Sequence, residues 1–269
     1  MTIACQELAG GKILSSVEDA VGTITFNQPE KHNAMSVAMW AGLEQILDGW
    51  EKNSAVRVVV LTGAGDKAFM SGADISEFEE RRSNDDQQRE YERAIHGGRS
   101  KLVAFSKPII ARVRGYCLGG GLAMAIQADI RIAAEDSQFG IPAARLGLGY
   151  GFHSVRRLVS LVGPAHAGMM LYTGERISAA EAARIGLVNR VVKNEELDGV
   201  VAEISHTIAH NAPLSIGANK LTIEQVLRDP EERDMEALRQ ANIACFNSQD
   251  YREGRTAFLE KRTPMFRGQ

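Results

Sequence analysis

The chain contains 269 residues, of which 44% are hydrophobic and 24% charged, and its formal net charge is −3. These values are typical of a globular protein that is long enough to bury a sizeable core. Acidic and basic residues are mixed along the sequence, which argues against nucleic-acid or membrane-surface binding, because both usually need a basic patch.

Targeting and metal-binding features are absent from the sequence. It has no apolar stretch long enough to span a bilayer, and its first residues lack the basic and apolar regions of a secretory signal. The three cysteines, Cys5, Cys117 and Cys245, lie far apart, so no disulfide framework is expected. No Cys/His cluster has metal-ligand spacing. We therefore expect a cytoplasmic protein without a metal site.

The first predicted elements are two strands, over 12–17 and 21–26, followed by a polar turn at 27–32. A helix is predicted over 36–52, because apolar residues recur there at helical spacing and Ser36 is a suitable N-cap.

A predicted strand over 56–62 leads into the first of two glycine loops, Ala68–Asp74. Asp74 could cap a helix that begins at Ile75. The highly charged segment 80–93 follows this loop, and it could be either a solvated surface segment or a lid that orders over a ligand.

The second glycine loop, Gly115–Gly121, follows a predicted strand over 108–114 and precedes an apolar helix at 122–126 and a strand at 129–133. The later part of the chain is mainly helical in pattern. Its predicted helices are 164–172, 178–185, 195–210, 213–228 and 231–247. The order predicts an α/β core over 1–205 that continues into a helical region over 206–269.

The two glycine loops indicate anion chemistry. Backbone N–H groups at helix starts lack internal partners and favour negative charge. Two such loops aimed at one point could stabilise a developing oxyanion. Neither loop has the spacing of a dinucleotide or phosphate loop, and a hydrolase elbow would need glycine where Phe69 and Ala73 stand. Cys117 has no adjacent base, so a buried, inert thiol is expected there.

Both loops resemble the oxyanion loops of the crotonase (enoyl-CoA hydratase/isomerase) superfamily. The first matches the pattern A-F-x-x-G-x-D, and the second matches G-x-x-x-G-G-G after K-P-x-I-A. Further matches follow in family order over nearly the whole chain. They are residues 27–35, 139–140, 146–147, 171–174, 182–188 and 253–262.

This resemblance implies an α/β fold, a spiral of ββα turns with a C-terminal helical trimerisation region, assembled as a homotrimer or a dimer of trimers. It implies that the backbone N–H groups of Ala73 and Gly120 form an oxyanion hole for a thioester carbonyl. It also implies contacts with coenzyme A, and no cofactor beyond the CoA part of the substrate. The implied CoA-binding residues are Lys31, Ala34, Ser71, Gly72, Asp74, Ile75 and Leu118, together with Phe258 and Lys261 of a neighbouring subunit. Lys31 and Lys261 could equally be ordinary surface lysines.

The sequence departs from the family at both catalytic carboxylates. Hydratases that the chain resembles carry glutamates at the positions of Ala123 and Ala143. A placed acid or base contributes about 10²–10⁴-fold to a rate, so ordinary hydration is disfavoured here.

Tyr150 is one candidate substitute. It stands thirty residues after Gly120, as does a tyrosine of the methylmalonyl-CoA decarboxylase branch, although that branch keeps a glutamate at the position of Ala123. Decarboxylation would create an enolate without a base. Tyr150 could instead be a loop tyrosine that packs on a neighbour.

Two histidines and an arginine are further candidates. His96 matches a catalytic histidine of the chlorobenzoyl-CoA dehalogenase branch, but Gly151 stands where that branch needs its nucleophilic aspartate. His153 could line the same pocket as Tyr150, and Arg145 could pair either with a substrate carboxylate or with a surface acid.

Several functions therefore stay open. The first is a lyase- or isomerase-type enzyme that stabilises a thioester enolate with non-standard acid and base residues. The others are an acyl-CoA decarboxylase, a thioester hydrolase with a histidine-activated water, and a non-catalytic acyl-CoA-binding protein.

Overall fold

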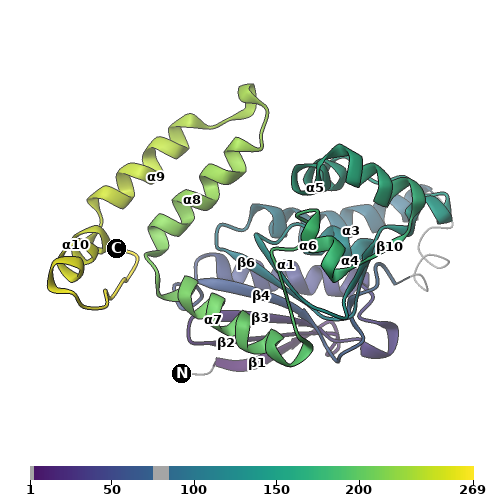
Figure 1. The fold of residues 1–269 in the computed structure, drawn as a ribbon, viewed down its shortest axis with the longest axis horizontal. Coiled ribbons are helices and arrows are strands. Elements are labelled where there is room, and N and C mark those ends of the chain that lie inside the picture. The colour runs from purple at the N-terminus through teal and green to yellow at the C-terminus, as the bar shows by residue number, and fades with distance from the viewer. Residues whose placement is uncertain (1–2, 75–84) are drawn as a thin grey trace.

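A seven-stranded sheet forms the centre of the protein, and the computed structural model describes residues 3–74 and 85–269 around it (Figure 1). The strand order is β1-β2-β3-β4-β6-β8-β11; β1 to β3 pair antiparallel and the rest pair parallel. The strands are β1 (Ile3–Leu8), β2 (Ile13–Glu18), β3 (Val21–Phe26), β4 (Val58–Gly63), β6 (Ile109–Val113), β8 (Ile130–Ala134) and β11 (Arg190–Val192).

A second sheet of four strands has the order β10-β9-β7-β5, and each of its strands is three residues long. They are β5 (Ala68–Met70), β7 (Tyr116–Leu118), β9 (Gln138–Gly140) and β10 (Arg176–Ser178). The chain passes from the large sheet to the small one three times, from β4 to β5, β6 to β7 and β8 to β9. These turns confirm the predicted α/β spiral of ββα units.

Strand β4 is buried on both faces along its apolar run, as is common for strands in a parallel sheet. Val58 and Val60 of β4 pack with α7 (Leu197–His210), whereas Val59 belongs to the core that includes α1 (Val37–Glu51). Because successive strand residues point to opposite faces, one strand joins both cores.

Helix α1 begins where it was predicted, and the Ser36 hydroxyl accepts a hydrogen bond from the Met39 N–H at 3.3 Å. It packs against α3 (Asp85–Ala104). The predicted helix at Ile75 and residues 80–84 of the predicted lid lie outside the described residues, whereas residues 85–93 of that segment belong to α3.

Helix α5 (Phe152–Thr173) is longer than predicted, because only its second half was expected to be helical. Its backbone leaves the helical region at Gly163, where φ is 73°, just before Pro164. Near its start, α5 carries Ser154, which lines the site described below. The short helices are α4 (Gly120–Ala125) and α6 (Ala179–Arg184).

Helices α8 (Pro213–Val226), α9 (Met235–Asn247) and α10 (Gln249–Glu260) extend to one side of the sheets, with α8 and α9 side by side (Figure 1). The boundary predicted between 205 and 206 falls within α7, which packs on the large sheet. A role of these helices in trimerisation stays a prediction.

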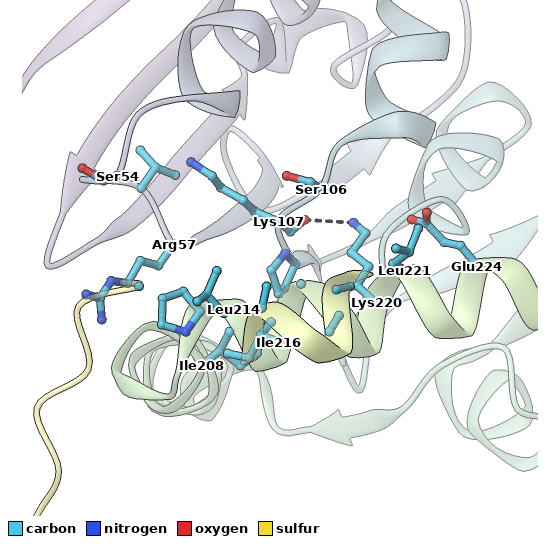
Figure 2. Close-up of a pocket in the computed structure, with 18 of the residues that line it drawn as sticks. Ser54, Arg57, Ser106, Lys107, Ile208, Leu214, Ile216, Lys220, Leu221 and Glu224 are labelled. Atoms are coloured by element: carbon cyan, nitrogen blue, oxygen red, sulfur yellow. Dashed lines mark hydrogen bonds between the residues drawn. The ribbon is translucent and has the colours of Figure 1, made fainter. Parts of the chain in front are cut away.

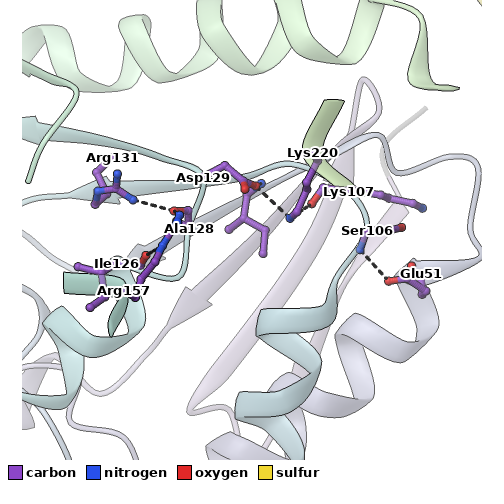
Figure 3. Close-up of polar contacts among 10 residues, drawn as sticks. Glu51, Ser106, Lys107, Ile126, Ala128, Asp129, Arg131, Arg157 and Lys220 are labelled. Atoms are coloured by element: carbon purple, nitrogen blue, oxygen red, sulfur yellow. Dashed lines mark hydrogen bonds and ion pairs between the residues drawn. The ribbon is translucent and has the colours of Figure 1, made fainter. Parts of the chain in front are cut away.

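A buried lysine fixes α8 to the core. Lys220 donates hydrogen bonds to the Lys107 carbonyl at 2.8 Å and to Asp129 Oδ2 at 3.0 Å (Figure 3). The same Asp129 oxygen accepts the Ile109 N–H at 2.7 Å, at the start of β6. The carboxylate therefore links α8 to the large sheet.

Candidate active site

Strands β5 and β7 deliver the two glycine loops to the same place. They pair in parallel, with Ala68 opposite Tyr116 and Met70 opposite Cys117. Because parallel strands end at the same edge of a sheet, the loops that follow them leave side by side.

The backbone nitrogens of Ala73 and Gly120 lie close together. A Cβ atom added to Gly120 would lie 3.4 Å from the Ala73 nitrogen, and one added to Gly72 would lie 3.5 Å from the Gly120 nitrogen. Neither the Ala73 nor the Gly120 N–H donates to an acceptor among the described residues. Two unused donors therefore stand next to one another.

Glycine is required in the second loop for two different reasons. Gly119 has a φ of 51°, a conformation that side chains disfavour. A Cβ atom at Gly121 would lie 2.1 Å from the Met70 carbonyl oxygen, so no larger residue fits between this loop and β5.

The first loop is held by the segment that precedes α1. Met35 donates its N–H to the Gly72 carbonyl at 2.8 Å and accepts the Asp74 N–H at 3.0 Å. These bonds flank Ala73 on both sides, which fixes the peptide that carries its N–H.

A cavity of about 250 Å³ opens beside these two amides, and both Ala73 and Gly120 line it. Ala123 lines it as well, one helical turn along α4. Ala143 is half-buried in a short 3₁₀ helix, Pro142–Leu146, packs against the core and is not among the described lining residues. Ala123 therefore places a methyl group in the cavity, at the position where the resembled hydratases carry their first catalytic glutamate.

Tyr150 lies in this cavity, and its hydroxyl donates a hydrogen bond to the Gly119 carbonyl at 2.7 Å. Burial raises the pKa of the Tyr150 hydroxyl well above its usual range, and the charge of nearby Arg99 opposes this only in part. The phenol is therefore protonated at neutral pH. Its partner carbonyl and the Gly120 N–H belong to one trans peptide group, so they point in opposite directions.

Arg99 is the functional candidate that the sequence did not indicate. It projects from α3 into the cavity, on the face shared with Ile95 and Leu102, and donates a hydrogen bond to the buried Ser154 hydroxyl. Helical spacing of three and four residues would have placed these three together, but nothing in the sequence says which face of α3 meets the loops.

The two candidate histidines and Arg145 lie away from the cavity. His96 is exposed on another face of α3, with Nδ1 3.2 Å from Ser100 Oγ. His153 is exposed beside Phe152, because the neighbouring Ser154 occupies the inward face of α5. The Arg145 guanidinium donates to the Thr173 carbonyl at 3.1 Å. None of the three is among the described lining residues, so we no longer assign them a place in the pocket.

Most residues that the resemblance assigned to CoA lie next to the first loop. Lys31 forms an ion pair with the buried Asp74 at 2.7 Å, and the Ser71 hydroxyl donates to the Lys31 carbonyl at 3.3 Å. Ala34 and Leu118 are buried, Gly72 lines the cavity, and Ile75 lies outside the described residues.

Phe258 and Lys261 lie in and just after α10, at the opposite side of the molecule from α4 (Figure 1). The Phe258 side chain is 83% exposed. Within one chain these residues do not approach the glycine loops, so the predicted contact with CoA would have to come from another subunit.

The structure also bears on the expectations for Cys117, for metal ligands and for membrane-spanning segments. Cys117 is fully buried in β7, and burial raises the pKa of its thiol far above the usual range. Within residues 3–74 and 85–269, no group of histidine, cysteine and acidic side chains could hold a metal ion. No helix in the same ranges has the length and hydropathy to cross a membrane.

A larger cavity of about 520 Å³ lies between the core and the C-terminal helices (Figure 2). Arg57, Lys107, Lys220 and Glu224 line it together with apolar side chains of α7 and α8. The lysines there are already bonded to carbonyl groups and to Asp129, and neither glycine loop reaches this cavity. The smaller cavity is therefore the better candidate for chemistry.

Several known proteins are similar to this chain in sequence and in fold. Residues 16–269 match the family model described as enoyl-CoA hydratase/isomerase. The short-chain-enoyl-CoA hydratase of Clostridium acetobutylicum is 36% identical over 252 residues, covering 93% of this chain and 95% of that protein. The crotonyl-CoA hydratase of Syntrophomonas wolfei is 36% identical over 259 residues, covering 96% and 99%.

A solved structure agrees with these matches. The enoyl-CoA hydratase/carnithine racemase of Magnetospirillum magneticum superposes with a TM-score of 0.91 at 34% identity, covering 97% of each chain. The chain therefore belongs to the enoyl-CoA hydratase/isomerase family, within the crotonase superfamily that its glycine loops resemble.

Proposed function

We propose that this protein binds an acyl-CoA thioester with its carbonyl oxygen between the N–H groups of Ala73 and Gly120 and stabilises the enolate of that thioester. One observation carries the proposal: two neighbouring amides, unused by the described residues, line a cavity. The relatives named for acyl-CoA hydration support the substrate class. One such donor is worth about 10²–10³ in kcat.

The CoA part would follow the first loop outward. Lys31, Ser71 and Asp74 form one polar cluster there. Their polar and charged groups suit the nucleotide end of CoA. Phe258 and Lys261 would come from a neighbouring subunit, which fits a homotrimer or a dimer of trimers in the cytoplasm. No cofactor other than the CoA moiety is needed.

The acid and base groups differ from those of a two-glutamate hydratase. The described lining contains no carboxylate and no histidine, and Tyr150, protonated at neutral pH, can donate a proton but cannot accept one. Formation of the enolate therefore cannot rely on a carboxylate base at residue 123 or 143.

Decarboxylation is the second candidate, and the absence of a base in the described lining favours it. A C–C bond of a β-carboxyacyl thioester would break, its electron pair would pass to the thioester oxygen, and CO₂ would leave. A proton from Tyr150 or from water would then complete the product. The oxyanion site is the same in both candidates.

A panel of acyl-CoA thioesters tests the proposal, with free CoA as the control. We expect the thioesters to raise the melting temperature beyond the effect of free CoA, because only they place a carbonyl between the two amides. Mass spectrometry of the products would separate hydration, isomerisation, decarboxylation and hydrolysis. Binding without any turnover would show a non-catalytic acyl-CoA-binding protein, and neither protection nor turnover would refute the proposal.

A further inference from the structure

Arg99 is the only charged side chain in the described lining of the candidate active site. The rest of that lining consists of apolar residues, glycines and neutral polar groups such as Gln127, Tyr150 and Ser154. The described part of the lining therefore carries a net positive charge from one residue.

This charge has no anionic partner within the described protein. The Arg99 guanidinium donates to the neutral Ser154 hydroxyl, and no carboxylate of the described residues lies within 4.0 Å of it. A half-buried cation without a counter-charge is unfavourable, and an anionic group on a ligand would relieve that cost.

The anion should belong to the acyl group. The cavity shares its walls with Ala73 and Gly120, and its volume of about 250 Å³ is below the range of roughly 300–1,000 Å³ that drug-sized ligands need. A short acyl chain fills such a space, whereas the phosphates of CoA would lie outside, near Lys31. The planar fork of an arginine suits a carboxylate, which it can bind through two hydrogen bonds.

We propose that Arg99 binds a carboxylate on the acyl group, so that the substrates are short dicarboxylic acids joined to CoA through one carboxyl group. The proposal rests on the function proposed above, and it adds the class of acyl group. Ala123 in the lining agrees with this class of substrate, because a glutamate there would repel the substrate carboxylate.

Isothermal calorimetry with three saturated thioesters tests this inference. Glutaryl-CoA carries the carboxylate, its terminal amide is a neutral analogue of the same size, and butyryl-CoA lacks the polar end. We expect wild-type protein to bind glutaryl-CoA about 10- to 100-fold more tightly than the amide. Arg99→Met should abolish this preference, so that glutaryl-CoA and its amide bind with similar affinity. Arg190→Met is the matched control, because Arg190 is exposed on the edge strand β11.

The outcomes separate the two proposals. Equal affinity of wild-type protein for glutaryl-CoA and its amide overturns the role of Arg99 but leaves thioester binding intact. Binding of none of the three thioesters overturns both. The wild-type comparison needs no variant, so poor folding of Arg99→Met cannot obscure the result. Arg99→Lys keeps the charge without the fork, and it should retain part of the preference.

Discussion

The hydrogen bond from Tyr150 to Gly119 makes a sharp prediction about the oxyanion site. The Gly119 carbonyl accepts the Tyr150 hydroxyl at 2.7 Å and the Ala123 N–H at 3.0 Å. The Gly120 N–H belongs to the same planar peptide group and points in the opposite direction. Tyr150 therefore orients one of the two proposed donors without touching the thioester oxygen itself.

Tyr150→Phe removes this bond and little else. The Gly119 carbonyl keeps the Ala123 N–H, so the loss of folding free energy should be that of one ordinary hydrogen bond, about 0.5–1.5 kcal/mol. Complete loss of an oxyanion donor costs about 10²–10³ in kcat, and a donor that is only less well aligned should cost about tenfold. KM should change little, because the Ala73 and Gly120 amides remain.

Two measurements follow the variant. Steady-state kinetics with the thioester identified by the panel give the division between kcat and KM, and isotope-edited infrared spectra of a bound thioester report the carbonyl frequency without turnover. We expect the shift of the bound carbonyl toward lower frequency to decrease in Tyr150→Phe. Tyr172→Phe removes the same hydroxyl from a side chain that is 83% exposed, and it should change nothing.

The magnitude distinguishes positioning from acid catalysis. A loss of more than about 10²-fold in kcat with an unchanged carbonyl frequency would identify Tyr150 as the proton donor itself. Unchanged kcat together with an unchanged frequency would refute the reasoning, because the peptide would then hold its orientation without the phenol.

Three further predictions concern the loop, the helical region and the tail. Gly120→Ala places a methyl group between the two amides and should lower kcat by at least about 10²-fold with an unchanged circular dichroism spectrum; retained activity would contradict the oxyanion assignment. Lys220→Met leaves Asp129 without its cation and should lower the free energy of unfolding, measured in urea, by about 1.5–3 kcal/mol, whereas a change below about 0.5 kcal/mol would show that α8 is held by packing alone. Hydrogen bonds from Arg262 lower the pKa of Glu253 to about 2 from 4.5, so this ion pair contributes above pH 4.5 and is lost as pH falls through 2. An NMR titration should show that low midpoint in wild-type protein and a higher midpoint in Arg262→Met, where the Met265 N–H still donates to Glu253; an ordinary wild-type midpoint would contradict the contact.

Strands β2, β3, β4, β6 and β8 of the large sheet were predicted because they are long enough to show a pattern, whereas the edge strands β1 and β11 were not predicted. The strand predicted over 56–62 is confirmed as β4, and its four consecutive apolar residues are buried on both faces of the sheet. The small sheet was not predicted, since each of its strands has three residues, too few for any periodicity. That sheet nevertheless aligns the glycine loops.

The candidate site likewise has a part that the sequence indicated, the glycine loops, and a part that it did not, the face of α3. The glycine positions predicted two loops suited to an anion, and only the resemblance to the crotonase superfamily singled out the amides of Ala73 and Gly120. The contribution of α3 could not be predicted. His96 and Arg99 are three residues apart, and only the rotation of the helix against the loops decides that Arg99 faces the cavity while His96 faces solvent.

The charge of the cavity connects the proposed reaction with the proposed substrate. Two glutamates near the oxyanion amides would make the site negative, which suits a neutral acyl chain and a water molecule that must lose a proton. Here alanines occupy residues 123 and 143, and Arg99 makes the described lining positive. The two differences act in the same direction, because both favour a negative charge on the ligand. That charge could be the substrate carboxylate, the developing enolate or both, and the glutaryl-CoA comparison with its amide isolates the first from the second.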